Sequence, residues 1–210
     1  IADMLLNPGT QYRYNGQTRT YPEIKLVYWA GGNPFHHHQD LNRLRDAFAR
    51  VDTLVVHELG WTATARHADI VLPATTQLEH WDIHTSYGHL HIQINEPAIA
   101  PIGESLPNTE IFRRLAKALN LPAALFSATD EELIDEVLVE SKRASAYPPA
   151  KALAGITREK LLAQGATRLN LPSPYTPFAH GGFGTPDGKC DLWGAPEHQP
   201  RFVPPHEDPR

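Results

Sequence analysis

Two glycines, an Asn-Pro pair and a run of histidines follow one another early in the chain, and these residue types could hold a phosphate-bearing cofactor. Gly31 and Gly32 come directly after an apolar run at 24–30 and allow positive φ, so the backbone can approach a ligand without a Cβ clash. Asn33 is a favourable helix N-cap and Pro34 a favourable first helical residue, so the N–H groups that follow would point outwards with partial positive charge. The pattern predicts a phosphate site, with a plain strand–helix turn as the open alternative.

Polar residues also end the next two apolar runs. The run at 53–56 leads into His57 and Glu58, which is about where a dinucleotide-binding fold places the acid that binds the ribose. The run at 69–73 leads into the hydroxyl of Thr75. Because the carboxyl ends of parallel strands meet at one edge, these residues are predicted to share a crevice with the glycines. The glycines do not fit the Gly-x-Gly-x-x-Gly pattern, so NAD and FAD are not favoured as ligands. They do not fit the Walker pattern of a P-loop either.

A metal is the other chemistry that the histidines suggest. Consecutive side chains at a helix start point in different directions, so one ion would rarely bind His36, His37 and His38 together. We therefore predict no metal ligand in this chain, and a hydrolase that uses the histidines with a metal stays a lesser hypothesis. The single cysteine, Cys190, excludes an internal disulfide and any multi-cysteine zinc or iron–sulfur site within this chain.

The sequence around these residues predicts strands that alternate with helices and position the residues. The apolar runs lack polar alternation, as strands buried on both faces do, and right-handed crossovers then imply a parallel sheet. The predicted fold class is α/β, with a three-layer, Rossmann-like parallel sheet followed by a helical and Pro/Gly-rich extension. Doubly wound sheets usually have about five or six strands, so this sheet is predicted to be partial, unless it packs on the helices of 108–164. The predicted strands are 24–30, 53–56 and 69–73, and the predicted helices are 38–49 and 61–67.

Flanking segments have weaker patterns. Residues 1–23 predict a surface excursion, and the alternating residues 89–94 predict a half-exposed strand. One helix is predicted to be capped by Asn108 or Thr109, and others are predicted to start at a capping box over 129–132 and at Thr157. Trp29, Trp61 and Trp81 are predicted to lie in the core, and residues 166–210 to be irregular.

Composition limits the partners. The chain has 210 residues with a net charge of −5, which argues against a broad nucleic-acid or anionic-membrane surface. Apolar runs stay well short of the roughly 20 residues of a membrane span, so no membrane insertion is predicted. The start at Ile1 and the Pro-rich end suggest a piece of a longer polypeptide, with a tagged or processed whole protein as the alternative. Cytoplasm and periplasm are not distinguished.

Two long segments and one short one together resemble a known family. The first contains Ala30-Gly31-Gly32-Asn33-Pro34-Phe35-His36-His37-His38-Gln39-Asp40, the second is 61–76 with Glu79, and the third, weaker one is 184–192. They resemble the molybdopterin oxidoreductases of the dimethyl sulfoxide reductase family, in particular the S- and N-oxide reductase branch. One difference is Glu79-His80-Trp81-Asp82, where those reductases typically have Glu-Arg-Asn-Asp. It leaves the substrate open and keeps a formate-dehydrogenase-like enzyme as an alternative.

The resemblance implies a domain organisation and a cofactor. Residues 1–122 would be half of a Rossmann-like domain that binds molybdopterin guanine dinucleotide, 123–165 a helical extension, and 166–210 a linker towards a β-barrel domain outside the chain. The cofactor would contain molybdenum, or else tungsten, and would be completed by the remaining domains of the same polypeptide. The expected activity is two-electron redox or oxygen-atom transfer on a small-molecule substrate, with this segment inactive by itself. A free-standing nucleotide-binding module without redox activity is the alternative.

The resemblance also implies roles for individual residues. It expects no catalytic residue and no metal ligand in this segment. The open alternatives are a solvated strand end for Glu58, an ion pair of Arg66 with Asp69, and capping of backbone N–H groups by Asp69. The residues expected to line the cofactor are Gly31, Gly32, Asn33, Pro34, His36, His37, His38 and Gln39, with Thr75 at the sheet edge, His57 and Glu58 near the guanosine, and Arg66 and Asp69 close by.

Overall fold

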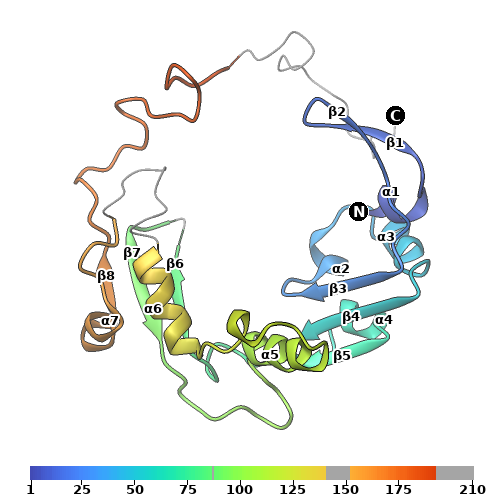
Figure 1. Cartoon of the computed structure of the whole chain (residues 1–210), viewed down its shortest axis with the longest axis horizontal. Helices are drawn as coiled ribbons and strands as arrows, with labels where there is room; N and C mark the ends of the chain where they lie inside the picture. The colour runs from blue at the N-terminus through green and yellow to red at the C-terminus, as the bar shows by residue number, and fades with distance from the viewer. Residues whose placement is uncertain (87, 141–151, 193–210) are drawn as a thin grey trace.

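The computed structural model describes residues 1–86, 88–140 and 152–192. Its elements follow one another around an open arc, with a parallel sheet towards one end and an antiparallel sheet towards the other (Figure 1). Helix α5 (Asn108–Ala118) lies between the two sheets. The α/β fold class is therefore confirmed.

The parallel sheet has the order β3-β4-β5. Its strands are β3 (Leu26–Ala30), β4 (Thr53–Glu58) and β5 (Ile70–Pro73), and all neighbours run parallel. The connections are α2 (Pro34–His37) and α3 (Leu41–Phe48) between β3 and β4, and α4 (Ala63–His67) between β4 and β5. The three predicted strands are confirmed because each is a short, continuous apolar run bounded by turn residues.

The helix predicted at 38–49 is wrong in its start. The chain forms the single turn α2 and breaks at His38, which is extended, before α3 begins at Leu41. Asp40 adopts a left-handed conformation (φ 50°), and its carboxylate accepts the Arg43 N–H at 3.2 Å. An N-cap inside the predicted helix divides it, because a capping aspartate has non-helical backbone angles.

Helices cover both faces of this sheet, which gives three layers. On one face α1 (Ala2–Leu6), α3 and α4 pack over the strands around a core whose buried members include Leu5, Leu44, Phe48 and Val56. On the other face α5 contributes Ile111, which is 8% exposed. Residues 1–23 are thus more than the predicted surface excursion, because α1 joins the core and β1 (Gln11–Tyr14) pairs with β2 (Gln17–Thr20) in a hairpin.

The second sheet joins segments that are distant in sequence. Strands β6 (Asp82–Thr85) and β7 (His91–Asn95) pair antiparallel, and β8 (Ala166–Arg168) adds to β7. Helices α6 (Asp130–Glu140) and α7 (Arg158–Gln164) cover one face, and the short 3₁₀ helix η1 (Ala123–Leu125) precedes them. The buried core between this sheet and its helices consists of Ile92, Ile134, Leu138, Ile156 and Leu161.

The helix starts predicted at Thr129 and Thr157 are confirmed, whereas α5 has Pro107 at its N-cap position and no side-chain cap from Asn108 or Thr109. The backbone N–H of Thr129 donates to Glu132 at 2.8 Å, and the N–H of Glu132 donates to the Thr129 hydroxyl at 3.2 Å, which is a capping box. Thr157 caps α7, and Gly165 ends it with φ 72°. The structure finds β8 in the segment predicted to be irregular, while residues 193–210 of that segment lie outside the described residues.

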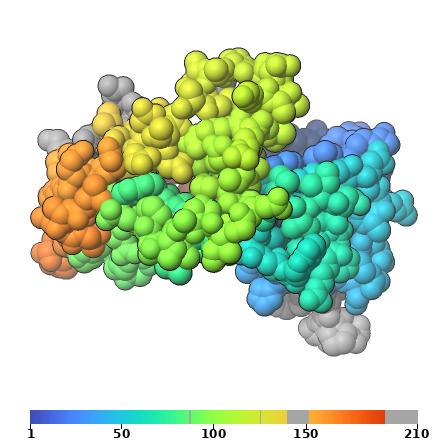
Figure 2. All heavy atoms as spheres, turned by 90° about the horizontal axis from the view of Figure 1, so that it is seen from below, coloured from blue at the N-terminus to red at the C-terminus, as the bar shows by residue number. Residues whose placement is uncertain are grey.

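The space-filling view shows two lobes joined by the α5 region (Figure 2). One lobe contains the parallel sheet and the other contains β6 to β8 with their helices. Within the described ranges, none of the helices is both long and apolar enough to cross a membrane.

Candidate nucleotide-binding edge of the parallel sheet

The glycine turn has the backbone conformation that the sequence predicts. Gly31 has φ +90° and Gly32 has φ +76°, and both are exposed directly beyond the carboxyl end of β3. A Cβ at Gly31 would meet no atom within 4 Å, and one at Gly32 would lie 3.7 Å from Nε1 of Trp29. The N–H groups of Gly32 and Asn33 make no hydrogen bond to any part of the chain that the structure describes, whereas the N–H of Gly31 faces the His57 carbonyl at the end of the β3–β4 ladder. This backbone has the openness and the free donors that a phosphate group needs.

Helix α2 starts where the sequence predicts, with Asn33 at the N-cap position and Pro34 as its first residue, but without a side-chain cap. Asn33 does not cap the helix with its side chain; its Oδ1 accepts a short hydrogen bond from the Thr64 hydroxyl. The N–H of Phe35 donates to Oγ1 of Thr64 at 3.3 Å, and those of His36 and His37 donate to the Asn33 carbonyl at 2.9 and 3.0 Å. The predicted donors after Pro34 are therefore already used, because the turn closes on itself and on α4. The free donors lie earlier, at Gly32 and Asn33.

The three histidines do not face one common point. His36 and His37 are exposed, with ring centroids 5.1 Å apart, whereas His38 is half-buried with its ring 5.7 Å from that of Trp29. Gln39 is exposed just beyond them. Among the described residues, no group of three or more His, Cys, Asp or Glu side chains is arranged to hold a metal ion.

His57 lies inside the protein at the end of β4. It is 3% exposed, and both ring nitrogens have partners: Nε2 is 2.6 Å from the Tyr28 hydroxyl and Nδ1 is 2.8 Å from Oδ1 of Asn108. Because the amide oxygen only accepts, Nδ1 must carry the proton, and the Tyr28 hydroxyl donates to Nε2. Burial raises the pKa of Tyr28, which keeps the hydroxyl protonated. His57 thus has no free nitrogen for a ligand and instead ties β3, β4 and α5 together.

Glu58 and Thr75 do lie at the carboxyl edge, each with internal partners. The Glu58 carboxylate accepts the Thr62 hydroxyl at 2.8 Å and the Leu59 N–H at 3.3 Å. Thr75 is buried, with its hydroxyl 2.8 Å from Nδ1 of His80. Both side chains are therefore held in place before any ligand binds.

Arg66 and Asp69 separate in the structure. Oδ2 of Asp69 accepts the Leu54 N–H at 2.7 Å, at the amino end of β4, so Asp69 lies at the opposite edge from the glycines. Asp69 therefore caps a backbone N–H group, which is one of the alternatives that the sequence left open. The Arg66–Asp69 pair is not formed, since Arg66 is exposed and its guanidinium makes no ion pair or hydrogen bond with a described residue.

Trp61 corrects a prediction and adds a candidate to the site. It was predicted to lie in the core, yet it is 73% exposed, in the loop that follows Glu58. Leu59 in the same loop is 64% exposed. The position of Trp61 in the sequence did indicate exposure. It comes three residues after the end of a strand, next to a glycine, where loops and not cores are expected.

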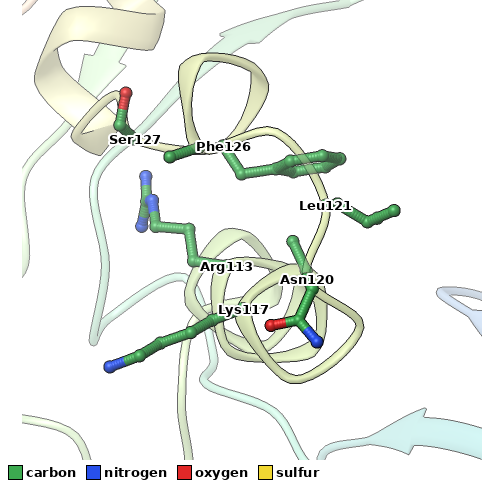
Figure 3. Close-up of a pocket in the computed structure, with 8 residues that line it drawn as sticks. Arg113, Lys117, Asn120, Leu121, Phe126 and Ser127 are labelled. Carbon is green, nitrogen blue, oxygen red and sulfur yellow. The ribbon is translucent and has the colours of Figure 1, made fainter.

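A separate pocket of about 580 Å³ lies between the C-terminal half of α5 and residues 120–127 (Figure 3). Arg113 lies at its wall, but the guanidinium already binds Asp130 at 2.7 Å and the Ala128 carbonyl at 2.8 Å. Because Arg113 is used internally, Lys117 is the basic side chain that this pocket leaves to a phosphate among its described lining residues. The exposed carboxyl edge remains the better candidate.

Comparison with known proteins decides which family has this arrangement. Residues 6–118, from α1 to the end of α5, match the family model described as Molybdopterin oxidoreductase. The chain belongs to the molybdopterin oxidoreductase family. Membership implies a molybdopterin cofactor with molybdenum and confirms the resemblance seen in the sequence.

Relatives of this molybdopterin oxidoreductase segment include S- and N-oxide reductases. It is 50% identical over 131 residues to biotin sulfoxide reductase of Cereibacter sphaeroides, covering 62% of this chain and 18% of that protein. It is 47% identical over 133 residues to dimethyl sulfoxide/trimethylamine N-oxide reductase of the same organism, covering 62% of this chain and 16% of that protein. The segment therefore spans less than a fifth of the length of these relatives.

A solved structure supports the fold of the segment. Acetylene hydratase from Pelobacter acetylenicus superposes with a TM-score of 0.62 at 21% identity, over 83% of this chain and 22% of that one. The likeness extends beyond the residues matched by the family model, so the fold similarity includes part of the second lobe.

Proposed function

We propose that the carboxyl edge of the parallel sheet holds the guanine nucleotide part of a molybdopterin guanine dinucleotide cofactor, in an enzyme that reduces an S- or N-oxide. The observation that supports this most directly is the exposed Gly31–Asn33 turn, whose free N–H groups lie in a segment 50% identical to a biotin sulfoxide reductase. Free backbone donors at a strand end suit a diphosphate. Tungsten in place of molybdenum is compatible with the same residues.

Different residues at this edge would make different kinds of contact with the nucleotide. The N–H groups of Gly32 and Asn33 would donate to a phosphate, and exposed His36 and His37 would add donors beside it. Arg66, whose guanidinium has no partner in the described part of the chain, would supply the positive charge. Exposed Trp61 offers a ring on which a planar base can stack.

Buried residues at the same edge would act as a support. His57 fixes β3 and β4 against α5, and Glu58 fixes the loop that presents Trp61. Asp69 lies at the far edge and is not expected to contact the cofactor. We therefore propose the exposed residues as binding groups and His57 and Glu58 as positioning groups.

The cofactor, when bound, supplies the two-electron redox chemistry. The net reaction consumes an S- or N-oxide, two electrons and two protons and yields a sulfide or amine and one water. No described residue is assigned an acid–base role. The segment is expected to bind and orient the cofactor and to be inactive alone, with the remaining domains of the same polypeptide completing the site.

Ligand choice by the 210-residue chain tests the binding part of this proposal. Isothermal calorimetry with GDP, ADP and NAD should show weak binding with a preference for GDP. The Arg66→Gln variant should weaken it, and Arg19→Gln, which changes an exposed arginine of the β1–β2 hairpin, should not. Equal affinity for all three nucleotides, or a preference for NAD, would contradict the assignment.

Turnover tests the catalytic part. The full-length polypeptide that contains this segment, loaded with cofactor, should oxidise a reduced viologen with dimethyl sulfoxide, trimethylamine N-oxide or biotin sulfoxide. Formate oxidation without any oxide reduction would instead favour the formate-dehydrogenase-like alternative. Turnover by the 210-residue chain alone would refute its proposed inactivity.

A further inference from the structure

The first turn of α5 makes side-chain hydrogen bonds to both lobes. Asn108 and Thr109 are the first two residues of this helix. Oδ1 of Asn108 lies 2.8 Å from Nδ1 of His57, at the end of β4. The Thr109 hydroxyl donates instead to Oδ1 of Asp130 at 2.6 Å, at the start of α6. One helix turn therefore contacts the candidate nucleotide-binding edge and the second lobe at once.

On the sheet side, Asn108 determines the state of the His57 ring. Because the Asn108 oxygen only accepts, it requires a proton on Nδ1, which leaves Nε2 to accept the Tyr28 hydroxyl at 2.6 Å. The rings of Tyr28 and Phe112 pack beside the imidazole, each with its centroid 5.2 Å from that of His57. His57 is thus held in one tautomer and one orientation, and Asn108 supplies the acceptor that selects them.

The backbone around His57 reaches both parts of the candidate site. Its carbonyl faces the N–H of Gly31 at the end of the β3–β4 ladder, directly before the free N–H groups of the turn. The next residue, Glu58, accepts a hydrogen bond that fixes the loop of Trp61. A displaced His57 would therefore move the phosphate donors and the exposed indole ring together.

On the side of the second lobe, Asp130 joins α6 to the same turn of α5. Its carboxylate accepts the guanidinium of Arg113 at 2.7 Å as well as the Thr109 hydroxyl. Arg113 extends from α5 towards the segment before α6 (Figure 3) and also donates to the Ala128 carbonyl at 2.8 Å. The side chains of Asp130 and Arg113 are only 17% and 22% exposed, so salt screens this pair less than a surface pair. The second lobe thus holds the helix turn that orients His57.

We infer that Asn108 and Asp130 are positioning residues for nucleotide binding, through which the second lobe controls the Gly31 turn. Asn108 orients His57 and thereby the turn, and Asp130 holds α5 where Asn108 can do so. Neither residue is assigned a contact with the nucleotide. Because coupling between sites is reciprocal, a bound nucleotide also stabilises the observed placement of the second lobe. The inference rests on the proposed function, which supplies the nucleotide.

Calorimetry with GDP on variants of the 210-residue chain tests the role of Asn108. Asn108→Ala should weaken GDP binding at least about fivefold, which is the lower end of ordinary coupling between sites. Asn108→Asp should bind GDP as wild type does, because a carboxylate also accepts the Nδ1 proton. Both variants keep the start of α5 in place, since the backbone of Leu106 still bonds to Pro73 and Thr75, each at 3.1 Å.

The same measurement tests the role of the second lobe. Asp130→Ala should also weaken GDP binding, by less than Asn108→Ala, because the backbone bonds of Leu106 still hold the start of α5. Glu136→Gln is the matched control on α6, since this exposed carboxylate makes no ion pair or hydrogen bond with a described residue. It should leave the affinity unchanged.

NMR of the His57 ring nitrogens and of the backbone amides gives a readout that a general loss of stability would not change. Wild type and Asn108→Asp should have the ring proton on Nδ1 alone. Asn108→Ala should show a mixture of the two tautomers and shifted amide signals for Gly31 and Gly32, in a chain that remains folded.

Several results would overturn the inference. Unchanged GDP affinity in Asn108→Ala, or an equal loss in Asn108→Asp, would refute the role of Asn108. Unchanged affinity in Asp130→Ala would refute the role of the second lobe, and this variant decides the matter if Asn108→Ala does not fold.

The amide signals also separate this inference from the proposed function. A wild-type chain that binds no GDP would contradict the proposed function alone. In that case, signals of Gly31 and Gly32 that move in Asn108→Ala would still support the positioning role, and signals that stay in place would refute it.

Discussion

Position 31 needs glycine for its backbone angle and not for lack of space. Its φ of +90° is one that residues with a Cβ rarely adopt, while a Cβ at this position would meet no atom within 4 Å. A strained but sterically tolerated substitution is therefore a clean way to move this turn without disturbing the core.

Gly31→Ala should lower the free energy of unfolding by roughly 1–2 kcal/mol, because alanine is disfavoured at positive φ. It should also weaken GDP binding, since the shifted turn misplaces its free N–H groups. Urea unfolding and calorimetry measure the two effects. Gly184→Ala is the matched control, because Gly184 has no positive φ, has equally open space and lies outside the proposed site. If Gly31→Ala leaves both quantities unchanged, the turn is not the site.

Arg66 and Asp69 should separate binding from stability. Arg66→Gln should reduce GDP affinity by about tenfold, equivalent to ~1.4 kcal/mol, with stability changed by no more than about 0.5 kcal/mol. Asp69→Ala should do the reverse, costing about 1 kcal/mol of stability because the Leu54 N–H loses its acceptor. Loss of GDP affinity in the Asp69 variant would place that residue in the site after all.

At the scale of elements, one carboxylate joins the segment after β5 to the loop before α5. Glu79 is 6% exposed and accepts the N–H and hydroxyl of Thr76, each at 2.7 Å, and the N–H of Ile102 at 2.7 Å. These bonds, first of all the one from the Thr76 N–H, hold the pKa of Glu79 below its ordinary value. The carboxylate belongs to a motif identified in the sequence, but its partner Ile102, 23 residues away, did not follow from any local pattern.

The depressed pKa of Glu79 predicts the direction of a pH effect. Its stabilising contribution is fully present above the ordinary glutamate pKa of about 4.3 and is lost as the pH falls through the lower folded value. The stability difference between wild type and Glu79→Gln, measured by urea unfolding, should therefore be largest at neutral pH and shrink below about pH 4.3. Glu96→Gln, at an exposed position, should show no comparable change. A difference that grows on acidification would contradict the bonding scheme.

For the whole molecule, two separate cores are the main organising feature. One lies between the parallel sheet and α1, α3 and α4, and the other between β6 to β8 and α6 and α7. Their buried members are far apart in the fold, so damage to one core should remain largely local.

Leu161→Ala should cost about 2–5 kcal/mol in the second core, where Leu161 is fully buried. Hydrogen exchange should then speed up in β6 to β8 while β3 to β5 keep their protection. Leu44→Ala, in the first core, should give the opposite map. Uniform loss of protection in either variant would show that the two lobes unfold as one unit.

The parallel sheet, the glycine turn and the helix caps at Thr129 and Thr157 were all predictable from the sequence, because each is encoded by neighbouring residues with a definite period or a definite backbone angle. The family was predictable too, through long segments of particular residues. Which side chains are free for a ligand depended instead on the folded chain. Folding buried His57 against Tyr28 and Asn108, moved Asp69 to the opposite edge and exposed Trp61, since burial and pairing depend on contacts between residues far apart in the chain. Strand β8 was missed for the same reason, because three residues become a strand only when β7 lies beside them.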